Sequence, residues 1–167
     1  MDDFDAFHEM WTQPQVVRHI TGSPLTRREA WSRFLRNVGH WAAMGYGYWA
    51  VAEADSDRFI GDVGFLNLQR EIYQGEVLGE FALAPEAGWS LHPSVHGTGL
   101  ATEAMGAALR WADERYPFTI CTITTENRPS VTLASRLGYV PVQDVPWGDG
   151  EATVYRRSNP SGLERAL

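Results

Sequence analysis

The segment Gly88–Ala112 constrains the fold of this chain more than any other. It begins with a strand-like run to His92, turns at Pro93, passes through Gly97 and Gly99, and continues as an amphipathic helix. The first N–H groups of a helix have no intrahelical partner, and the helix dipole attracts negative charge there. Glycines let backbone N–H groups approach a phosphate because no Cβ atom intervenes. The sequence therefore predicts a loop that binds a phosphate-bearing cofactor.

Two common phosphate-binding loops do not fit this segment. A nucleotide P-loop ends in Gly-Lys-Ser or Gly-Lys-Thr, whereas Leu100 and Ala101 follow the second glycine here. A dinucleotide fingerprint reads G-x-G-x-x-G/A, but its last position falls on Thr102. The end of the next strand, near Cys121, also lacks the acidic residue that would bind a ribose. Both alternatives fail on specific residues.

The run resembles the acyl-CoA loop of the GNAT superfamily of N-acyltransferases, whose pattern is R/Q-x-x-G-x-G/A. His96 takes the first position, Gly99 the inner glycine and Ala101 the last position. His96 departs from the usual Arg or Gln, but its ring can donate a hydrogen bond. A second segment, Asn127–Tyr139, resembles the family's following helix and strand. Together the two segments are similar to the RimJ/RimL-like branch (ribosomal-protein-alanine acetyltransferase-like), and the resemblance covers most of the chain.

The resemblance implies an α/β (α+β) GNAT fold in a single domain over residues 1–167. This fold has a mixed, mostly antiparallel sheet with a splayed strand pair and about four helices. The family begins with an extra edge strand, whereas this chain begins directly at its first helix. Either the sheet lacks that strand or Met1 is not the natural start.

Periodicity and turn residues predict the individual elements. Asp2 or Asp3 can cap a first helix that Pro14 ends or bends. The capping box Thr26–Glu29 precedes a second helix that stops at Gly45. The apolar stripe of this second helix is expected at Trp31, Phe34, Leu35, Val38 and Trp41. The later elements are a hairpin of Tyr46–Ala54 and Arg58–Leu68, strand Glu86–His92, helix Thr98–Arg115, strand Phe118–Thr124, a helix from Pro129, and strands Tyr139–Val145 and Ala152–Arg157.

Composition and charge narrow the class of protein. A chain of 167 residues that is 44% hydrophobic can bury the core of one domain. The formal charge of −7 argues against nucleic-acid binding. It either favours cationic amines by steering or only keeps the protein soluble. No apolar run is long enough for a membrane span, and Met1-Asp2-Asp3 lacks a signal-peptide pattern. The single cysteine, Cys121, rules out an internal disulfide, so we expect a cytoplasmic protein.

The resemblance implies an acetyl-CoA-dependent N-acetyltransferase. It would transfer an acetyl group to a primary amine, either a peptide N-terminus or a small amine, by direct attack in a ternary complex, because aligning two substrates removes much of the entropic barrier. A rival interpretation is a non-catalytic acyl-CoA-binding sensor, which His96 and Ala134 favour; many family members carry a Tyr where Ala134 stands. We expect no metal site, because Pro93 breaks the helix that would align His92 with His96. Exposed edge strands would allow a homodimer.

Cofactor contacts are expected from the strand end, the loop and the turn before the next helix. Free backbone groups at Leu91 and His92 would pair with the pantetheine arm as an added strand, and the pyrophosphate would lie on the N–H groups of Gly97–Ala101. Asn127 would hold the pantetheine arm; alternatively, it is a turn residue. The residues concerned are Leu91, His92, His96, Gly97, Thr98, Gly99, Leu100, Ala101, Asn127 and Ser130.

A base is needed because an amine is mostly protonated near neutral pH, with α-amino groups titrating at about 7.7–8.0. Glu86 is the first candidate, with Glu80 and Asp62 as alternates. The alternative for Glu86 is a surface charge at the edge of a loop. Ser130 is the candidate donor to the departing sulfur; alternatively, it is a capping hydroxyl in the first turn of a helix.

Overall fold

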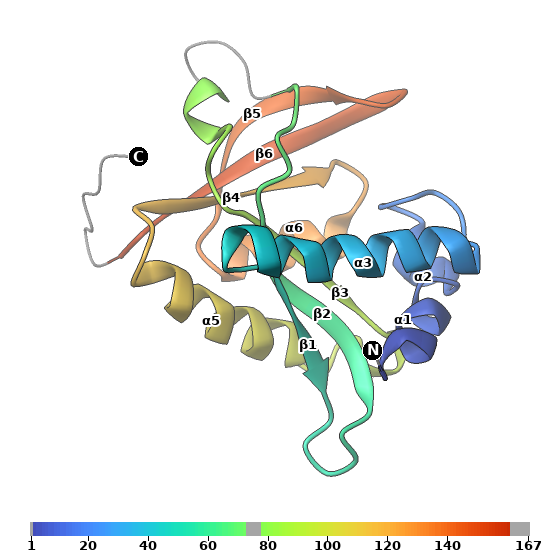
Figure 1. Ribbon diagram of the computed structural model, residues 1–167. Helices are drawn as coiled ribbons and strands as arrows, with labels where there is room; N and C mark the ends of the chain where they lie inside the picture. Colours follow the sequence, from blue (N-terminus) through green and yellow to red (C-terminus); the bar gives the residue numbers. More distant parts are fainter. Residues whose placement is uncertain (1, 73–77, 161–167) are drawn as a thin grey trace. The chain divides into compact units, whose positions relative to one another are not determined.

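The computed structural model describes residues 2–72 and 78–160, in a chain that divides into two compact units. The first unit comprises Met1–Gly64 and Gly88–Ala104, and the second comprises Phe65–Ala87 and Met105–Leu167. Six strands form a sheet in the order β1-β2-β3-β4-β6-β5 (Figure 1). Three of the strand pairs are antiparallel and one is parallel. The predicted mixed, mostly antiparallel sheet is therefore confirmed, while the single domain over residues 1–167 stays a prediction.

The first unit opens with α1 (Phe4–Met10) and α2 (Pro14–Val17). Asp3 occupies the N-cap position of α1, but its side chain makes no capping hydrogen bond, so the predicted side-chain cap is not formed. Pro14 does not simply end α1. It begins α2, because the fixed φ and missing N–H of proline suit the first position of a helix. The described residues consequently contain five α-helices, one more than the expected four.

The third helix, α3 (Arg27–Met44), begins and ends as predicted. Thr26 accepts a hydrogen bond from the backbone of Glu29, and the Glu29 carboxylate accepts one from the backbone of Thr26. Gly45 follows with a φ of 70°, a left-handed conformation that glycine adopts without the Cβ penalty. Both predicted helix boundaries are confirmed.

The predicted apolar stripe of α3 is wrong at two positions. Trp31 and Phe34 pack against the first-unit core, but Leu35 and Val38 are 43% and 52% exposed. Residues three and four apart share a helix face, and Phe34 lies on the same face as the buried Ala30. Leu35 and Val38 lie one turn after Trp31 and Phe34, so the helical spacing alone does not bury them. The buried members of this core are Phe4, Phe7, Met10, Trp11, Val16, Val17, Ala30 and Phe59.

A hairpin of β1 (Tyr48–Ala52) and β2 (Phe59–Leu66) follows, and α3 lies across it (Figure 1). The indole Nε1 of Trp41 donates to the carbonyl oxygen of Tyr48 at 2.9 Å, which ties the helix to the strand. Gly61 permits the predicted close backbone approach, because a Cβ there would clash with the carbonyl oxygen of Ser90 in the next strand. Next come β3 (Glu86–Leu91) and the 3-10 turn η2 (Pro93–Val95).

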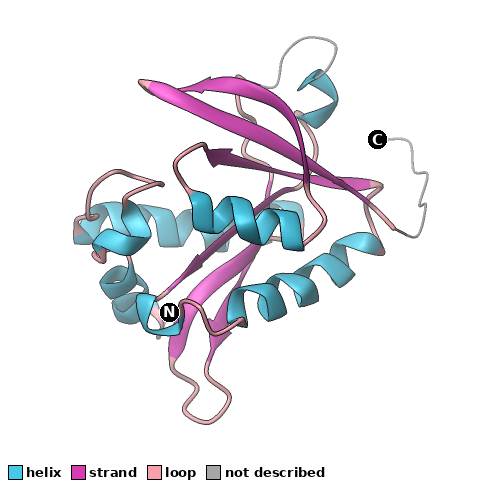
Figure 2. Ribbon diagram, turned by 180° about the vertical axis from the view of Figure 1, so that it is seen from behind, coloured by secondary structure: helices cyan, strands magenta, loops and turns pink. Residues whose placement is uncertain are grey.

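The second unit contains η1 (Gly79–Phe81), most of α5 (Leu100–Asp113), β4 (Phe118–Thr124), α6 (Arg128–Arg136), β5 (Val140–Trp147) and β6 (Gly150–Ser158). Strands β5 and β6 form a long hairpin (Figure 2), and β6 also pairs antiparallel with β4. At its other edge β4 pairs in parallel with β3, with Glu86 opposite Ile120. The buried members of this core are Leu78, Phe81, Ala84, Phe118, Ile120, Val145, Ala152 and Val154.

Cys121 lies in β4 and is only 1% exposed. Burial, with the Glu86 carboxylate as a second cause, raises the pKa of the Cys121 thiol. A thiol in this environment stays protonated and unreactive, so the predicted packing role of Cys121 is supported. Within residues 2–72 and 78–160, no helix combines the length and apolar character that crossing a membrane requires.

Candidate active site

The segment after β3 folds as a glycine corner that leads into a helix. Gly97 and Gly99 have φ values of 76° and 91°, which residues with a Cβ rarely adopt. Gly99 then begins the helix, because its carbonyl oxygen accepts from the N–H groups of Thr102 and Glu103 at 2.9 and 3.1 Å. The two glycines therefore set the path of the chain into α5, which starts two residues later than predicted.

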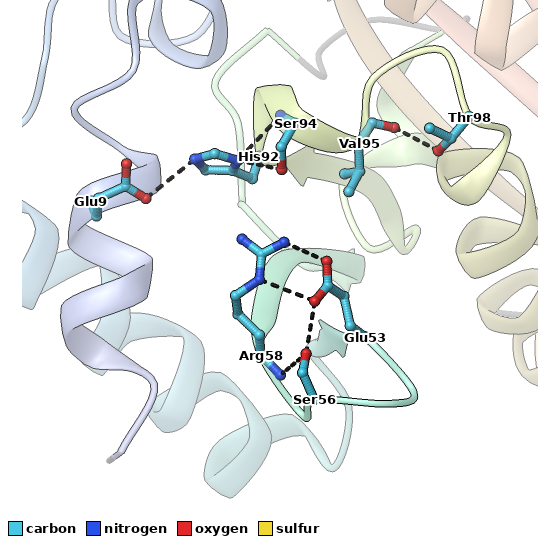
Figure 3. Close-up of polar contacts among 8 residues, drawn as sticks. All are labelled: Glu9, Glu53, Ser56, Arg58, His92, Ser94, Val95 and Thr98. Atoms are coloured by element: carbon cyan, nitrogen blue, oxygen red, sulfur yellow. Dashed lines mark hydrogen bonds and ion pairs between the residues drawn. The ribbon is translucent and has the colours of Figure 1, made fainter.

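The N–H groups of this corner are available to a ligand. Among the described residues, the backbone N–H groups from Gly97 to Ala101 have no hydrogen-bond acceptor. A Cβ added at either Gly97 or Gly99 would meet nothing within 4 Å, so the space beside the corner is open. The side chain of Thr98 turns back, and its hydroxyl donates to the carbonyl oxygen of Val95 at 2.7 Å (Figure 3). Unpartnered N–H groups at the start of a 14-residue helix are an arrangement that suits an anion.

Two expectations about the neighbouring residues need correction. The ring Nε2 of His96 donates to the carbonyl oxygen of Leu91 at 2.9 Å, so this nitrogen is directed back to the strand. The N–H of His92 donates to the carbonyl oxygen of Ile60 at 2.8 Å, and its carbonyl oxygen accepts from Val95. These backbone groups of Leu91 and His92 were expected to be free for the pantetheine arm. They already have partners, because β2 and the turn after β3 lie beside them.

The His92 side chain joins the turn after β3 to α1. Its Nδ1 lies 2.8 Å from the hydroxyl of Ser94 and accepts from the Ser94 N–H at 3.2 Å. Its Nε2 lies 3.3 Å from the Glu9 carboxylate (Figure 3). The ring is thus fixed from both sides, and the turn that precedes the glycine corner is anchored to the first helix.

Glu86 lies in the second unit and is 5% exposed, so the alternative of a surface charge is wrong. Arg70 binds its carboxylate through two groups: Nε lies 3.0 and 2.8 Å from the two oxygens, and the terminal nitrogen Nη2 lies 2.8 Å from Oε1. The Arg70 guanidinium also stacks on the Trp147 ring, 4.6 Å from its centre. A carboxylate held in this bidentate manner has a fixed orientation. The alternate Glu80 is exposed in η1.

Asn127 and Ser130 lie at the start of α6 in the second unit. Asn127 is the N-cap residue, and its side-chain oxygen accepts from the Ser130 N–H at 3.3 Å. The capping role that was the alternative for Ser130 therefore falls to Asn127. Ala134, at the position where many GNAT members carry Tyr, is fully buried.

The sequence makes Asp62 only an alternate candidate for the base, whereas the structure shows that its carboxylate is buried. Asp62 in β2 is 4% exposed, and burial raises its pKa to about 7, although Arg33 and Arg36 act in the opposite direction. Its Oδ2 accepts from the side-chain amide of Asn37 at 3.4 Å. A signal was present: Arg33 and Asn37 share a helix face with Ala30 and Phe34, and Asp62 is the only charged residue in the run Phe59–Leu66.

Comparisons with known proteins identify the family of this chain. The sequence matches the acetyltransferase (GNAT) domain family over residues 1–140. A protein from Bordetella pertussis assigned to the GnaT acetyltransferase family is 31% identical, with a TM-score of 0.81 over 95% of this chain and 91% of that one. An acetyltransferase from Agrobacterium tumefaciens is 26% identical, with a TM-score of 0.74 over 93% and 85% of the two chains.

The fold also occurs in a phosphinothricin acetyltransferase from Sinorhizobium meliloti that was solved in complex with acetyl-CoA. This protein is 16% identical, with a TM-score of 0.70 over 99% of this chain and 88% of that one. At this identity the likeness concerns the fold alone. The family match and the Bordetella relative are enough to assign the family: this chain belongs to the GNAT acetyltransferases.

Proposed function

We propose that this protein transfers an acetyl group from acetyl-CoA to a primary amine, either a peptide N-terminus or a small amine. The observation that carries the proposal is the glycine corner at Gly97–Ala101, where consecutive N–H groups lack acceptors within the described part of the chain and a Cβ at Gly97 or Gly99 would meet nothing within 4 Å. This arrangement suits the two phosphates of coenzyme A. The RimJ/RimL-like branch, the cytoplasmic location and a homodimer remain predictions from the sequence.

The protein's part in the reaction is to hold two substrates and manage protons. Acetyl-CoA would supply a thioester, whose thiolate is a good leaving group, so no covalent enzyme intermediate is required. The amine nitrogen forms the C–N bond while the C–S bond breaks. Positioning contributes most of the rate enhancement, because both reactants are held in contact. The diphosphate contacts from Gly97 to Ala101 fix one reactant.

Glu86 is the proposed acceptor of the proton that leaves the nitrogen as the C–N bond forms. Arg70 keeps the Glu86 carboxylate oriented through its bidentate contact. Ser130 is the proposed hydrogen-bond donor to the departing thiolate, and Asn127 fixes the first turn of α6 around it. The proton on Glu86 then passes to the thiolate or to solvent, which restores the carboxylate.

The first prediction is the release of a free thiol from acetyl-CoA when a panel of amines, peptides and polyamines is offered. The background from side-chain amines of the protein itself should be low, because the 167 positions include no Lys. Turnover with at least one amine supports an enzyme. Tight binding of coenzyme A without thiol release in the presence of any amine would support the sensor interpretation.

The second prediction concerns Glu86. Glu86→Gln should lower kcat by about 100-fold or more, the usual contribution of a general base, with the affinity for acetyl-CoA nearly unchanged. Glu151→Gln is the matched control, because it removes an exposed carboxylate of the same unit and should leave kcat as it is. Steady-state kinetics and calorimetric titration with coenzyme A measure the two quantities. Equal kcat in Glu86→Gln and wild type would remove Glu86 as the base.

A further inference from the structure

Three buried polar atoms without partners gather on the α3 side of β2 in the first unit. Within residues 2–72 and 78–160, the indole Nε1 of Trp11, the side-chain oxygen of Asn37 and Oδ1 of Asp62 are buried and have no hydrogen-bond partner. Each of these atoms would cost about 1–3 kcal/mol if it stayed unsatisfied. Buried polar groups in folded proteins are nearly always bonded to protein or to ordered water. The cluster therefore calls for a specific occupant.

Contacts link the three residues into one site. The Asn37 amide donates to Oδ2 of Asp62 at 3.4 Å. The Arg33 guanidinium lies 3.8 Å from the centre of the Trp11 ring and also acts electrostatically on Asp62. Trp11 follows α1, Arg33 and Asn37 come from α3, and Asp62 comes from β2. Asn37 and Asp62 are thus in direct contact, and Arg33 connects them to Trp11.

The unsatisfied atoms match the hydrogen-bonding capacity of one water molecule. The Trp11 N–H is a donor, whereas the free oxygens of Asn37 and Asp62 are acceptors. A water molecule can accept one hydrogen bond from the indole and donate one to each oxygen. Buried waters typically make about three such bonds. A buried water is also the one occupant that needs no opening wide enough for an organic group.

Asp62 is suited to accept a proton through such a water. Its pKa of about 7 is close to the working pH at which a general base is most effective. The charged groups that act on it are Arg33 and Arg36 of α3. Its neighbour in β1 is Ala50, which carries no charge. A buried carboxylate with this pKa and an unsatisfied oxygen is a candidate functional group rather than a packing residue.

Asp62 also lies on the same face of the sheet as Tyr48, whose hydroxyl contacts β3. In the β1–β2 register, Ala50 is opposite Asp62 and Tyr48 is opposite Gly64, so Tyr48 and Asp62 share a face. The Tyr48 hydroxyl occupies the place that a Cβ on Gly88 would take. Gly88 belongs to β3, the strand that leads into the glycine corner. Tyr48 therefore connects the sheet face that carries Asp62 to the strand before the proposed coenzyme site.

We propose that Asp62 is a proton acceptor of the acetyl transfer, and that a water held by Asp62, Asn37 and Trp11 carries the proton to it from the acceptor ammonium. This inference rests on the proposed function. An ammonium loses two protons on its way to an amide. The first passes through the water to the Asp62 carboxylate before attack, and the second leaves as the C–N bond forms. Asp62 then returns its proton to solvent, while the thiolate takes up the second proton.

The test is the pH dependence of kcat/KM for the amine, measured from about pH 5 to about pH 9. In the wild type, kcat/KM should rise through an inflection near pH 7. Asp62→Asn should lower kcat/KM by about tenfold or more above that inflection and should remove the inflection itself. Asp55→Asn is the matched control, because it removes an exposed carboxylate from the same hairpin and should match the wild type. Superimposable profiles of Asp62→Asn and wild type would overturn the proposal.

A second variant tests the role of the water, and a second measurement tests the protonation of Asp62 directly. Trp11→Phe keeps the ring and removes the indole N–H, so it should lower kcat/KM in the same pH range by a smaller factor. An unchanged profile in Trp11→Phe would overturn the water's part in the relay. A carbon-13 NMR titration of the Asp62 carboxyl tests its protonation without turnover. No thiol release by the wild type would defeat the proposed function itself, whereas normal turnover by Asp62→Asn would defeat this inference alone.

Discussion

Replacing Gly99 with Trp should lower the affinity for coenzyme A by at least about 100-fold. A side chain at Gly99 would extend into the open space beside the N–H groups of the corner. The indole would cover the place where the diphosphate is expected. The φ of 91° adds backbone strain of about 1–3 kcal/mol for a residue with a Cβ. Loss of even a few of the phosphate contacts should lower the affinity strongly, because charge-assisted hydrogen bonds are among the strongest hydrogen bonds in proteins. Calorimetric titration with coenzyme A measures the change.

Gly22→Trp is the matched control for this experiment. Gly22 also has a positive φ, 76°, and a Cβ there would meet nothing within 4 Å. It lies in a different loop of the first unit. The same strain is therefore introduced away from the corner, and the affinity should stay at the wild-type value. Wild-type affinity in Gly99→Trp would mean that the coenzyme binds elsewhere.

Asp62→Asn should stabilise the fold, and the gain should grow as the pH rises from about 4 to about 7. The pKa of Asp62 is raised from 3.8 to about 7 by burial, so the folded state holds a proton that the unfolded chain has already released. Stability of the wild type is highest below the unfolded value and falls as the pH rises towards the folded value. At 1.36 kcal/mol per unit, the complete difference is about 4 kcal/mol. Asn carries no charge at any pH and avoids this loss.

Urea unfolding at about pH 5 and about pH 8 measures the effect. The free energy of unfolding of Asp62→Asn should exceed that of the wild type by a larger margin at the higher pH. Asp55→Asn should show no such change in margin, since Asp55 is exposed. A margin that is constant with pH would show that Asp62 is not a buried titrating group. A stabilised variant that has lost activity would be the usual sign of a functional residue that weakens the fold.

The elements with strong local signals were predictable from the sequence. Strand Phe118–Thr124 was predicted with its observed bounds, because a β-branched run ends there at a turn. The boundaries of α3 followed from Thr26, Glu29 and Gly45, which act through contacts within a few residues. The stripe on α3 was less predictable. The residues of α3 that are buried depend on the side chains of β2 that pack against the helix. The residue types of the helix alone do not identify them.

The candidate site also has one part that was predictable from the sequence and another part that was not. Gly97 and Gly99 were identifiable because few other residues can adopt their backbone angles. The ring contact of His96 with Leu91 was not, because it depends on how the turn after β3 folds back. The importance of Asp62 as a candidate base was also not predicted from the sequence. A carboxylate becomes a strong candidate only when burial raises its pKa, and that burial comes partly from a helix distant in sequence.

The buried position of Cys121 bears on the protein's own exposure to a reactive thioester. Self-acylation requires a nucleophilic side chain, usually a thiolate or a neutral amine. Cys121 is 1% exposed and its pKa is raised by burial, so it is both inaccessible and protonated. With no lysine in the sequence, the side chains offer the acyl donor almost nothing to modify. An acyl donor bound to this chain would therefore meet neither a lysine nor an accessible thiol.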